Sequence, residues 1–386
     1  MDATRGAAQA ERSANQVACL RFLAETDEAQ TVGAISAETG LSRPTVHAVL
    51  EDLLEMGLVV STGPSSVGPG RPARAFRFDR LAGLVAGVDL GPRGTRAVIC
   101  DLSGRRLAYT EQRLDGRADV SLIQRAIHVA AEENSIDLAR LRAVGVALPG
   151  VIEANGHLRA SLALPELVGL PIAELVSKDL DRPVAVDNDI KLAALAEQRG
   201  GAGRGYSDVV YLQIGHRLSV SIVLNGVIRQ GRHRLAGELG AQRGMRWTRN
   251  AQRGQLVWSS QPTGEAVLSA AAGGDLDAQA EIEDFCAQIA GRIATVLLVV
   301  DPEVLVVRGG LPEFSSTLLR PLAAAVEKEL VFPERPPFVS SALGREAVVL
   351  GAVGTAFDQF GSEIYGLHDY PSPWSRITHD VERTTK

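Results

Sequence analysis

Apolar positions in the first sixty residues repeat with the period of a helix three times over. In SANQVACLRFLAE, Val17, Leu20 and Leu23 lie three residues apart and predict a first helix. Thr31 and Gly40 suit the first and last positions of a helix, so TVGAISAETG predicts a second one. A third is predicted in SRPTVHAVLEDLLEMG, where four apolar residues form one stripe: Val46, Val49, Leu50 and Leu53.

Only three residues, GLS at 40–42, separate the second and third predicted helices, a spacing typical of a helix-turn-helix. Ser42 suits the N-cap, and Arg43, Thr45 and His47 follow in the first turns of the third helix. This end of the recognition helix enters the major groove, so these four residues are the predicted DNA contacts. The alternative is a three-helix module that binds protein.

The next segment, STGPSSVGPGRPARAFRFD, predicts the β-hairpin of a winged helix-turn-helix. Glycines and prolines suit the tip of the hairpin, and AFRF at 75–78 alternates like a strand. Arg71 and Arg74 belong to a run of four arginines with one acid, Asp79, and such a run can bind phosphates or the minor groove. We predict DNA contacts for Arg71 and Arg74; the alternative is that the arginines only keep the loop solvated.

Beyond residue 83 the pattern changes to short apolar runs separated by glycine turns. GLVAGVDLGPRGTRAVICDLSGRRLAYTEQRL predicts three strands, and SDVVYLQIGHRLSVSIVLNGVIRQG repeats that plan. Helical and strand segments follow each copy. Two copies of one unit predict an α/β body of two similar lobes, with a ligand cleft between them.

Composition and charge place the chain among ordinary globular proteins of more than one domain, with 386 residues, 45% hydrophobic and 22% charged. A net charge of −6 excludes a surface that attracts nucleic acid everywhere, so DNA contact requires a local basic patch. The three cysteines are far apart, no basic-then-apolar leader is found, and no apolar run is long enough to cross a bilayer. A cytoplasmic protein without membrane association is expected.

The two glycine turns of the body would be phosphate loops in a nucleotide-binding protein, because glycine lets backbone N–H groups converge on an anion. The first turn keeps Gly91 and Gly94, but Pro92 lacks an N–H and Arg93 is bulky. The second, GHRLS at 215–219, is filled by large side chains. We expect that the body has lost nucleotide binding and needs no cofactor.

Seven short motifs occur in an order that is quite specific: GRPAR, GVDLG, GVALPG, VDNDIKLAALAE, LNGVIRQG, AGELG and DPEVLVVRGG. With them the chain resembles the ROK family of repressors and sugar kinases up to about residue 360, and more narrowly the family's transcription regulators. The resemblance implies a winged helix-turn-helix fused to a two-lobed, actin-like or ribonuclease-H-like ATPase fold. It also implies assembly as homodimers or homotetramers.

Residues beyond 360 lie outside the resemblance. Their two prolines predict an extended arm, although Tyr365, Tyr370 and Trp374 could dock on a neighbouring surface. The last helix of the second lobe is expected to return to the first lobe. The expected boundaries are 1–80 for the DNA-binding domain, 81–204 for the first lobe, 205–360 for the second lobe and 361–386 for the tail.

The resemblance also implies which residues would contact a sugar. In the family's kinases the aspartate of an NDAN motif is the base that deprotonates the sugar hydroxyl, and this chain keeps it as Asp189 in NDIK. The segment GELGA keeps the family's glutamate as Glu238. Asn188, Asp189 and Glu238 are therefore the predicted ligand contacts, the alternative being that they only satisfy backbone N–H groups. Lys191 would pair with Asp189 or point to solvent.

Other family positions are lost. Ala163 and Leu167 replace the asparagine and tryptophan of the family's NLPGW, and Ala241 replaces the histidine of GEIGH. The family's zinc-binding CxCGxxGC is absent, because no cysteine lies between Cys100 and Cys286. Structural zinc needs four nitrogen or sulfur ligands, so no metal site is predicted.

Together these patterns favour a DNA-binding transcriptional regulator, with repression as the favoured mode, rather than an enzyme. Its partners would be double-stranded operator DNA, further copies of itself, and a sugar or phosphorylated sugar. Positive charge for a phosphorylated sugar or another anion would come from Arg93, Lys191, His216 and Arg217, which could equally face solvent or pair with carboxylates. The alternatives are an active sugar kinase with a DNA-binding head and a regulator that needs no ligand.

Overall fold

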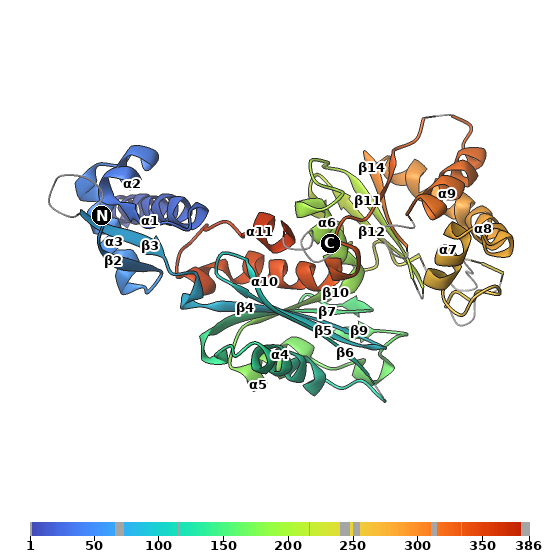
Figure 1. Ribbon diagram of the computed structural model, residues 1–386, viewed down its shortest axis with the longest axis horizontal. Helices are drawn as coiled ribbons and strands as arrows, with labels where there is room; N and C mark the ends of the chain where they lie inside the picture. The colour runs from blue at the N-terminus through green and yellow to red at the C-terminus, as the bar shows by residue number, and fades with distance from the viewer. Residues whose placement is uncertain are drawn as a thin grey trace.

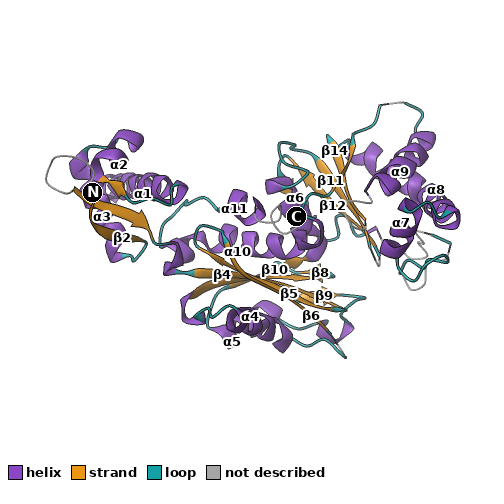
Figure 2. Ribbon diagram, viewed as in Figure 1, coloured by secondary structure: helices purple, strands orange, loops and turns teal. Residues whose placement is uncertain are grey.

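The structure is a computed structural model that describes residues 2–65, 73–114, 116–215, 217–239, 248–249, 255–309, 315–332 and 334–379. These residues form three parts in a row: a small N-terminal head, a first lobe beside it, and a second lobe at the far end (Figure 1). Helices and strands occur in all three parts (Figure 2). The predicted α/β fold class, a winged helix-turn-helix with a two-lobed body, is confirmed.

The head is a bundle of three helices against a three-stranded antiparallel sheet of order β1-β3-β2. Thr31 accepts a hydrogen bond from the Ala34 N–H at the start of α2 (3.2 Å), and Gly40 ends that helix with a φ of 71°. The core includes Leu20 and Leu50. The elements are α1 (Asp2–Glu25), β1 (Gln30–Thr31), α2 (Val32–Thr39), α3 (Arg43–Glu55), β2 (Val59–Ser65) and β3 (Ala73–Phe78).

The first lobe is built on a five-stranded sheet of order β10-β7-β4-β5-β6. Neighbours among β4, β5 and β6 are antiparallel, whereas β7 runs parallel to both β4 and β10. α4 and α5 cover one face of this sheet, and α10 covers the other (Figure 2). The elements are β4 (Leu84–Gly91), β5 (Gly94–Asp101), β6 (Arg106–Arg113), α4 (Ser121–Glu133), β7 (Leu141–Leu148), β8 (Val151–Ile152), β9 (Leu158–Ala160), α5 (Ile172–Leu180), β10 (Val184–Asn188), α6 (Asp189–Gly200) and α10 (Ala347–Tyr365).

The second lobe repeats this plan with the strand order β15-β14-β11-β12-β13. Again three consecutive strands are antiparallel, and two later strands add in parallel. The repeat in the sequence therefore corresponds to a repeat in the structure. The elements are β11 (Val209–Ile214), β12 (Leu218–Leu224), β13 (Val227–Ile228), α7 (Gly264–Ala272), α8 (Leu276–Val300), β14 (Val304–Gly309), α9 (Ser315–Glu329) and β15 (Phe338–Ser340).

Helix α10 returns from the second lobe and lies between the first-lobe sheet and α6. Two glycines set this close approach. A Cβ at Gly145 of β7 would lie 1.8 Å from the Ala352 carbonyl oxygen, and one at Gly351 would lie 2.0 Å from that of Leu192. Because no side chain fits at either position, α6 is held tightly against α10, and α6 carries Asp189 at its first residue.

The chain after residue 360 folds back onto the first lobe. α10 continues to Tyr365, and α11 (Trp374–His379) packs against α6. The Trp374 indole N–H donates to the Asp358 carboxylate (3.0 Å), and the rings of Tyr365 and Tyr370 lie 4.2 Å apart. The extended-arm interpretation is wrong for residues 361–379, because the packing of buried Tyr365 and Trp374 and half-buried Tyr370 outweighs the local effect of the prolines.

The head is connected to the first lobe by charged and polar contacts as well as by the chain itself. Asp27, just after α1, accepts from Arg80 (2.9 Å) and lies 3.5 Å from Arg105 of the body. From α11, Arg376 donates to the carbonyl of Ala24 at the end of α1 (2.6 Å). The C-terminal segment therefore contacts both the head and α6.

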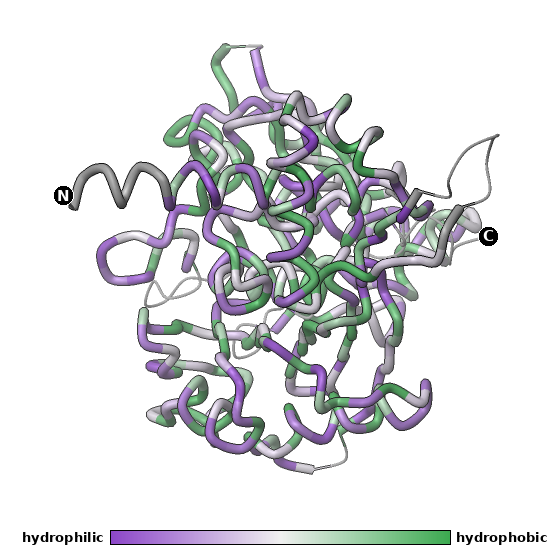
Figure 3. Tube along the Cα trace, turned by 90° about the vertical axis from the view of Figure 1, so that its left-hand side faces the viewer, coloured by the Kyte–Doolittle hydropathy of each residue, from purple (hydrophilic) through white to green (hydrophobic). Residues whose placement is uncertain are grey.

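Hydrophilic and hydrophobic residues are interspersed along the coloured trace in Figure 3. Among the helices that the structure describes, none combines the length and the apolar character needed to cross a membrane.

Candidate DNA-binding face and ligand cleft

The first turn of α3 presents polar side chains, as the sequence predicts. Ser42 caps the helix: its hydroxyl accepts from the Thr45 N–H (3.3 Å) and lies 2.7 Å from the Thr45 hydroxyl. Arg43 and His47 are exposed, while Thr45 is half-buried. The opposite face of α3 is buried in the head. Four of the predicted DNA contacts thus lie together on one exposed end of one helix.

Arg74 of the wing is anchored to α3 rather than isolated in solvent. Its guanidinium donates to the Ser61 hydroxyl (2.7 Å) and to Glu51 (3.1 Å), and it stacks 5.0 Å from the centre of the Phe76 ring. Glu51 also lies 4.0 Å from the His47 ring nitrogen. Glu51 was not predicted from the sequence, although its position four residues after His47 is a signal that could have found it. Arg71 lies outside the described residues.

A cleft of about 1430 Å³ separates the two lobes. The β4–β5 turn and the start of α6 line it from the first lobe, and β12, β14 and α7 line it from the second. All three predicted ligand contacts reach its wall: Asn188, Asp189 and Glu238. Arg308 also lines the cleft and was not predicted from the sequence. It lies near the end of a buried strand that leads to the cleft, and this position is the feature from which the sequence could have indicated it.

Asn188 holds the start of α6 in place. Its side-chain oxygen accepts from the Lys191 N–H (3.1 Å), and its amide group donates to the Gly150 carbonyl (2.8 Å). Both polar atoms of this buried side chain are therefore bonded to backbone. The contribution of Asn188 to the cleft is to position its neighbour, Asp189.

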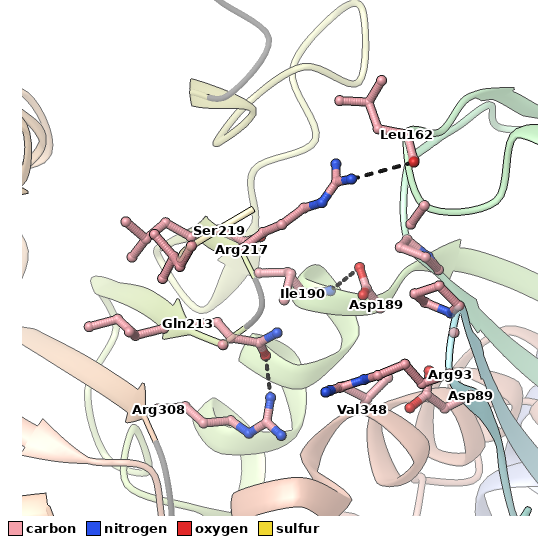
Figure 4. Close-up of a pocket in the computed structure, with 18 of the residues that line it drawn as sticks. Asp89, Arg93, Leu162, Asp189, Ile190, Gln213, Arg217, Ser219, Arg308 and Val348 are labelled. Carbon is pink, nitrogen blue, oxygen red and sulfur yellow. Dashed lines mark hydrogen bonds between the residues drawn. The ribbon is translucent and has the colours of Figure 1, made fainter. Parts of the chain in front are cut away.

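Asp189 lies at the N-terminus of α6 and faces the cleft (Figure 4). One carboxylate oxygen accepts from the Ile190 N–H (2.9 Å). Burial, and then the negative charges of Asp89 and Glu238, raise the pKa of Asp189 to about 7. Burial also raises the pKa of Glu238. The cleft thus holds two carboxyl groups that take up protons more readily than ordinary ones.

Lys191 does neither of the things predicted for it. It is 4% exposed, and its ammonium donates to the Gln230 side chain (2.9 Å) and to the Arg234 carbonyl (3.2 Å) of the second lobe. The Gln230 amide in turn donates to Asp187 (2.7 Å). Because α6 turns the residue two positions after Asp189 away from it, Lys191 joins the lobes instead of pairing with Asp189.

The described residues of the two glycine turns form hydrogen bonds and pairs within the turns themselves. In the first, Gly91 pairs with Gly94 across a two-residue turn made by Pro92 and Arg93. Before that turn, Asp89 is bound by Arg96 (3.0 Å).

In the second turn, the Gly215 N–H donates to the carbonyl of Arg217 (3.1 Å), so one donor is already used. The Arg217 side chain reaches across the cleft toward the Leu162 carbonyl (3.4 Å; Figure 4). His216 lies outside the described residues.

The residues present do not fit the zinc site of the family. The three cysteines are buried in separate elements: Cys19 in α1, Cys100 in β5 and Cys286 in α8. Within the described ranges, no three histidine, cysteine, aspartate or glutamate side chains are grouped so that they could hold a metal ion. The position of Ala241 lies outside those ranges.

The fold joins a helix-turn-helix head to a duplicated, two-lobed α/β body. Comparison with models of known protein families finds a match for each of these two parts. The ROK family model matches residues 85–255 and 241–358, and the model of the IclR helix-turn-helix domain matches residues 17–63. The chain belongs to the ROK family.

Similar proteins include both regulators and kinases. The xylose repressor of Bacillus spizizenii is 20% identical over 350 residues, which is 84% of this chain and 90% of that protein. The bifunctional enzyme NanE/NanK of Brucella suis is 30% identical over 236 residues, 57% of this chain and 44% of that protein.

Two solved structures share the fold. A ROK family transcriptional regulator, a homologue of the Escherichia coli MLC protein, superposes with a TM-score of 0.65 at 20% identity, covering 96% of this chain and 98% of that one. A ROK glucokinase from Streptomyces griseus, in complex with glucose and AMPPNP, gives 0.60 at 24% identity, covering 72% and 100%. The first likeness covers nearly the whole chain, head included, whereas the second covers less than three quarters of it.

Proposed function

We propose that this protein is a DNA-binding transcriptional repressor whose two-lobed body senses a sugar and does not phosphorylate it. The observation that carries the proposal is the presence, in one chain, of a helix-turn-helix and a ROK body. The xylose repressor and the ROK regulator support it, since they align over 84% and 96% of this chain. A repressor works where the DNA is, which for this protein would be the cytoplasm.

The exposed first turn of α3 would read the operator. Exposed Arg43 and His47 would reach base edges in the major groove, and Ser42 and Thr45 would contact the sugar-phosphate backbone. Arg74 would leave Glu51 for a DNA phosphate, with Arg71 as a second phosphate contact. In a homodimer or homotetramer, two heads would bind half-sites roughly 34 Å apart, so the operator would be palindromic or repeated.

The cleft would hold the effector. Asp189 and Glu238 offer acceptors for sugar hydroxyls, and Asn188 fixes the position of Asp189. A sugar is the class supported by the relatives, since one is named for xylose and another was solved with glucose.

Contacts along α6 provide a route from the cleft to the head. The helix begins at Asp189 and packs at its other end against α11, where a Cβ at Gly200 would lie 1.9 Å from the Thr378 hydroxyl oxygen. From α11, Arg376 binds the carbonyl of Ala24 in α1. A sugar that favours one arrangement of the lobes would therefore shift the position of the head, and with it the affinity for DNA.

A sugar kinase is the second candidate, because Asp189 is kept and a pKa near 7 suits a general base. Phosphoryl transfer also needs a cradle that positions the nucleotide phosphates. Here Pro92 removes an N–H from one turn, and the Gly215 N–H is bonded within the other. We therefore propose that the carboxyl group of Asp189 now serves recognition.

Selection from a pool of random duplexes with the purified full-length chain tests the regulator. We expect recovery of one motif with two half-sites, and a changed base preference for Arg43→Ala and His47→Ala. Recovery of no motif, or the same motif at the same affinity with both variants, contradicts the proposal.

A coupled assay of ATP turnover across hexoses and pentoses tests the kinase alternative. Sugar-dependent turnover would make the second candidate correct.

A further inference from the structure

The cleft contains arginines that no carboxylate neutralises directly. Arg96 pairs with Asp89, and Arg345 pairs with Glu265 (2.5 Å). By contrast, five other arginines at the cleft have no carboxylate of the described residues within 4.0 Å of their guanidinium nitrogens: Arg93, Arg113, Arg159, Arg217 and Arg308. Figure 4 labels three of them at the cleft: Arg93, Arg217 and Arg308. Arg217 and Arg308 are half-buried, whereas Arg93 is exposed. A half-buried arginine without a charged partner costs stability, and an anionic ligand that pairs with it offsets that cost.

Two of these arginines come from opposite lobes and point toward each other. Arg93 lies at the tip of the β4–β5 turn of the first lobe, and Arg308 lies on β14 of the second. Figure 4 shows their guanidinium groups directed at one another across the cleft, below Asp189. Gln213 accepts from one nitrogen of Arg308 (2.5 Å), which holds that side chain in the direction of Arg93. A pair of opposed guanidinium groups can bind one anion from two sides.

Arg217 is the third cleft arginine without a carboxylate partner that Figure 4 labels. Burial alone lowers the pKa of its guanidinium, and its hydrogen bond to the Leu162 carbonyl, at 3.4 Å, is a long one. Carboxyl groups are also near: burial raises the pKa of Asp89 and of Asp189, and the charge of Arg308 offsets part of that rise. Since Asp89 is already bound to Arg96, Asp189 is the acceptor that remains for a neutral hydroxyl beside the arginines.

We propose that the effector of this cleft is a phosphorylated sugar, with its phosphate between Arg93 and Arg308, its hydroxyl groups on Asp189 and Glu238, and Arg217 across the entrance. This proposal rests on the proposed function and names the chemical class of its effector. A phosphate ester suits the opposed pair because its three terminal oxygens and nearly two negative charges can face both lobes at once. The volume of about 1430 Å³ leaves room for such a ligand.

The experiment is calorimetric titration of the full-length protein with matched pairs: glucose and glucose 6-phosphate, N-acetylglucosamine and its 6-phosphate, and xylose and its 5-phosphate. Inorganic phosphate is titrated separately. We expect one phosphorylated sugar to bind at least about 10-fold more tightly than its parent sugar, because each charge-assisted pair of hydrogen bonds supplies roughly that factor. Arg93→Gln and Arg308→Gln should each remove most of the difference.

Two further variants separate this site from general effects of charge and folding. Arg308→Lys keeps the charge but loses the planar fork, so an intermediate affinity is expected. Arg117→Gln removes an exposed arginine that pairs with Glu166 outside the cleft, and it should bind like the wild-type protein. Operator binding by each variant without ligand shows that it is folded.

The outcomes distinguish this proposal from the one on which it rests. Equal affinity for a sugar and its phosphate, unchanged in the arginine variants, overturns the phosphate site and leaves the sugar-responsive repressor intact. Binding of inorganic phosphate alone, with no sugar phosphate preferred, identifies only an adventitious anion and also overturns it. Failure of every compound to bind, with operator binding retained, overturns both the phosphate site and the sensor, but not the DNA-binding function.

Discussion

The carboxyl group of Asp189 gives a prediction that needs neither DNA nor a ligand. Its pKa in the folded protein is raised to about 7, whereas an unfolded chain has a value of about 4. The folded state therefore binds the proton more tightly. The carboxyl group costs no stability below about pH 4, and the cost grows as the pH rises to about 7, after which it is constant.

Asp189→Asn should remove this cost. The amide oxygen can still accept from the Ile190 N–H, and the group stays neutral at every pH. A pKa rise from about 4 to about 7 corresponds to at most about 4 kcal/mol. Because the side chain is only half-buried and borders an open cleft, solvent reduces this to about 1–3 kcal/mol, or about 2–8 °C in Tm for a domain of this size.

Differential scanning calorimetry at pH 5.5 and pH 8 measures the effect. The variant should be the more stable at both pH values, and its advantage at pH 8 should be about twice that at pH 5.5, because pH 5.5 lies midway between the unfolded and folded pKa values of Asp189. Asp181→Asn is the control, since Asp181 is fully exposed and its left-handed backbone (φ 51°) accommodates asparagine. If the difference between Asp189→Asn and wild type is the same at both pH values, the environment described for Asp189 is wrong.

Three further predictions follow from the head, the core and their connection. Arg74→Gln should weaken binding to all duplexes alike and reduce the slope of log affinity against log salt by about 1; a loss confined to some sequences would make Arg74 a base reader. Gly145→Ala should destabilise by about 3 kcal/mol, because its Cβ would meet the Ala352 carbonyl, whereas Gly63→Ala, with open space around it, should not; equal melting temperatures would contradict the packing. Arg376→Ala, which removes the bond to Ala24, should leave operator affinity unchanged without effector but reduce its release by effector, and unchanged release would exclude this contact from the coupling.

Local signals were enough to predict the head. Thr31 and Ser42 cap their helices through their own hydroxyl groups, and Gly40 ends α2 in a left-handed conformation that few other residues adopt. The two lobes were also predictable, because a repeated pattern of strands in the sequence produces the same sheet order twice. In each case, residues close together in the sequence decide the structure.

The cleft could be predicted only in part, because its geometry depends on residues distant in the sequence. Asp189 was found from its motif, but the partners of Lys191 lie 39 and 43 residues away, and no periodicity announces them. Arg217 meets a carbonyl 55 residues before it, in the other lobe. The docking of Trp374 on α10 likewise depends on a space left by Gly354, which is visible only when both segments are placed.

The central claim, that the head places this protein on operators, is tested most directly by mapping the DNA bound in the source cell, for the wild-type chain and for Arg43→Ala expressed at equal level. We expect discrete promoter sites for the wild-type chain that share a motif with two half-sites, and loss of those sites in the variant. Absence of discrete sites for the wild-type chain, or the same sites with the same occupancy for the variant, would contradict the claim.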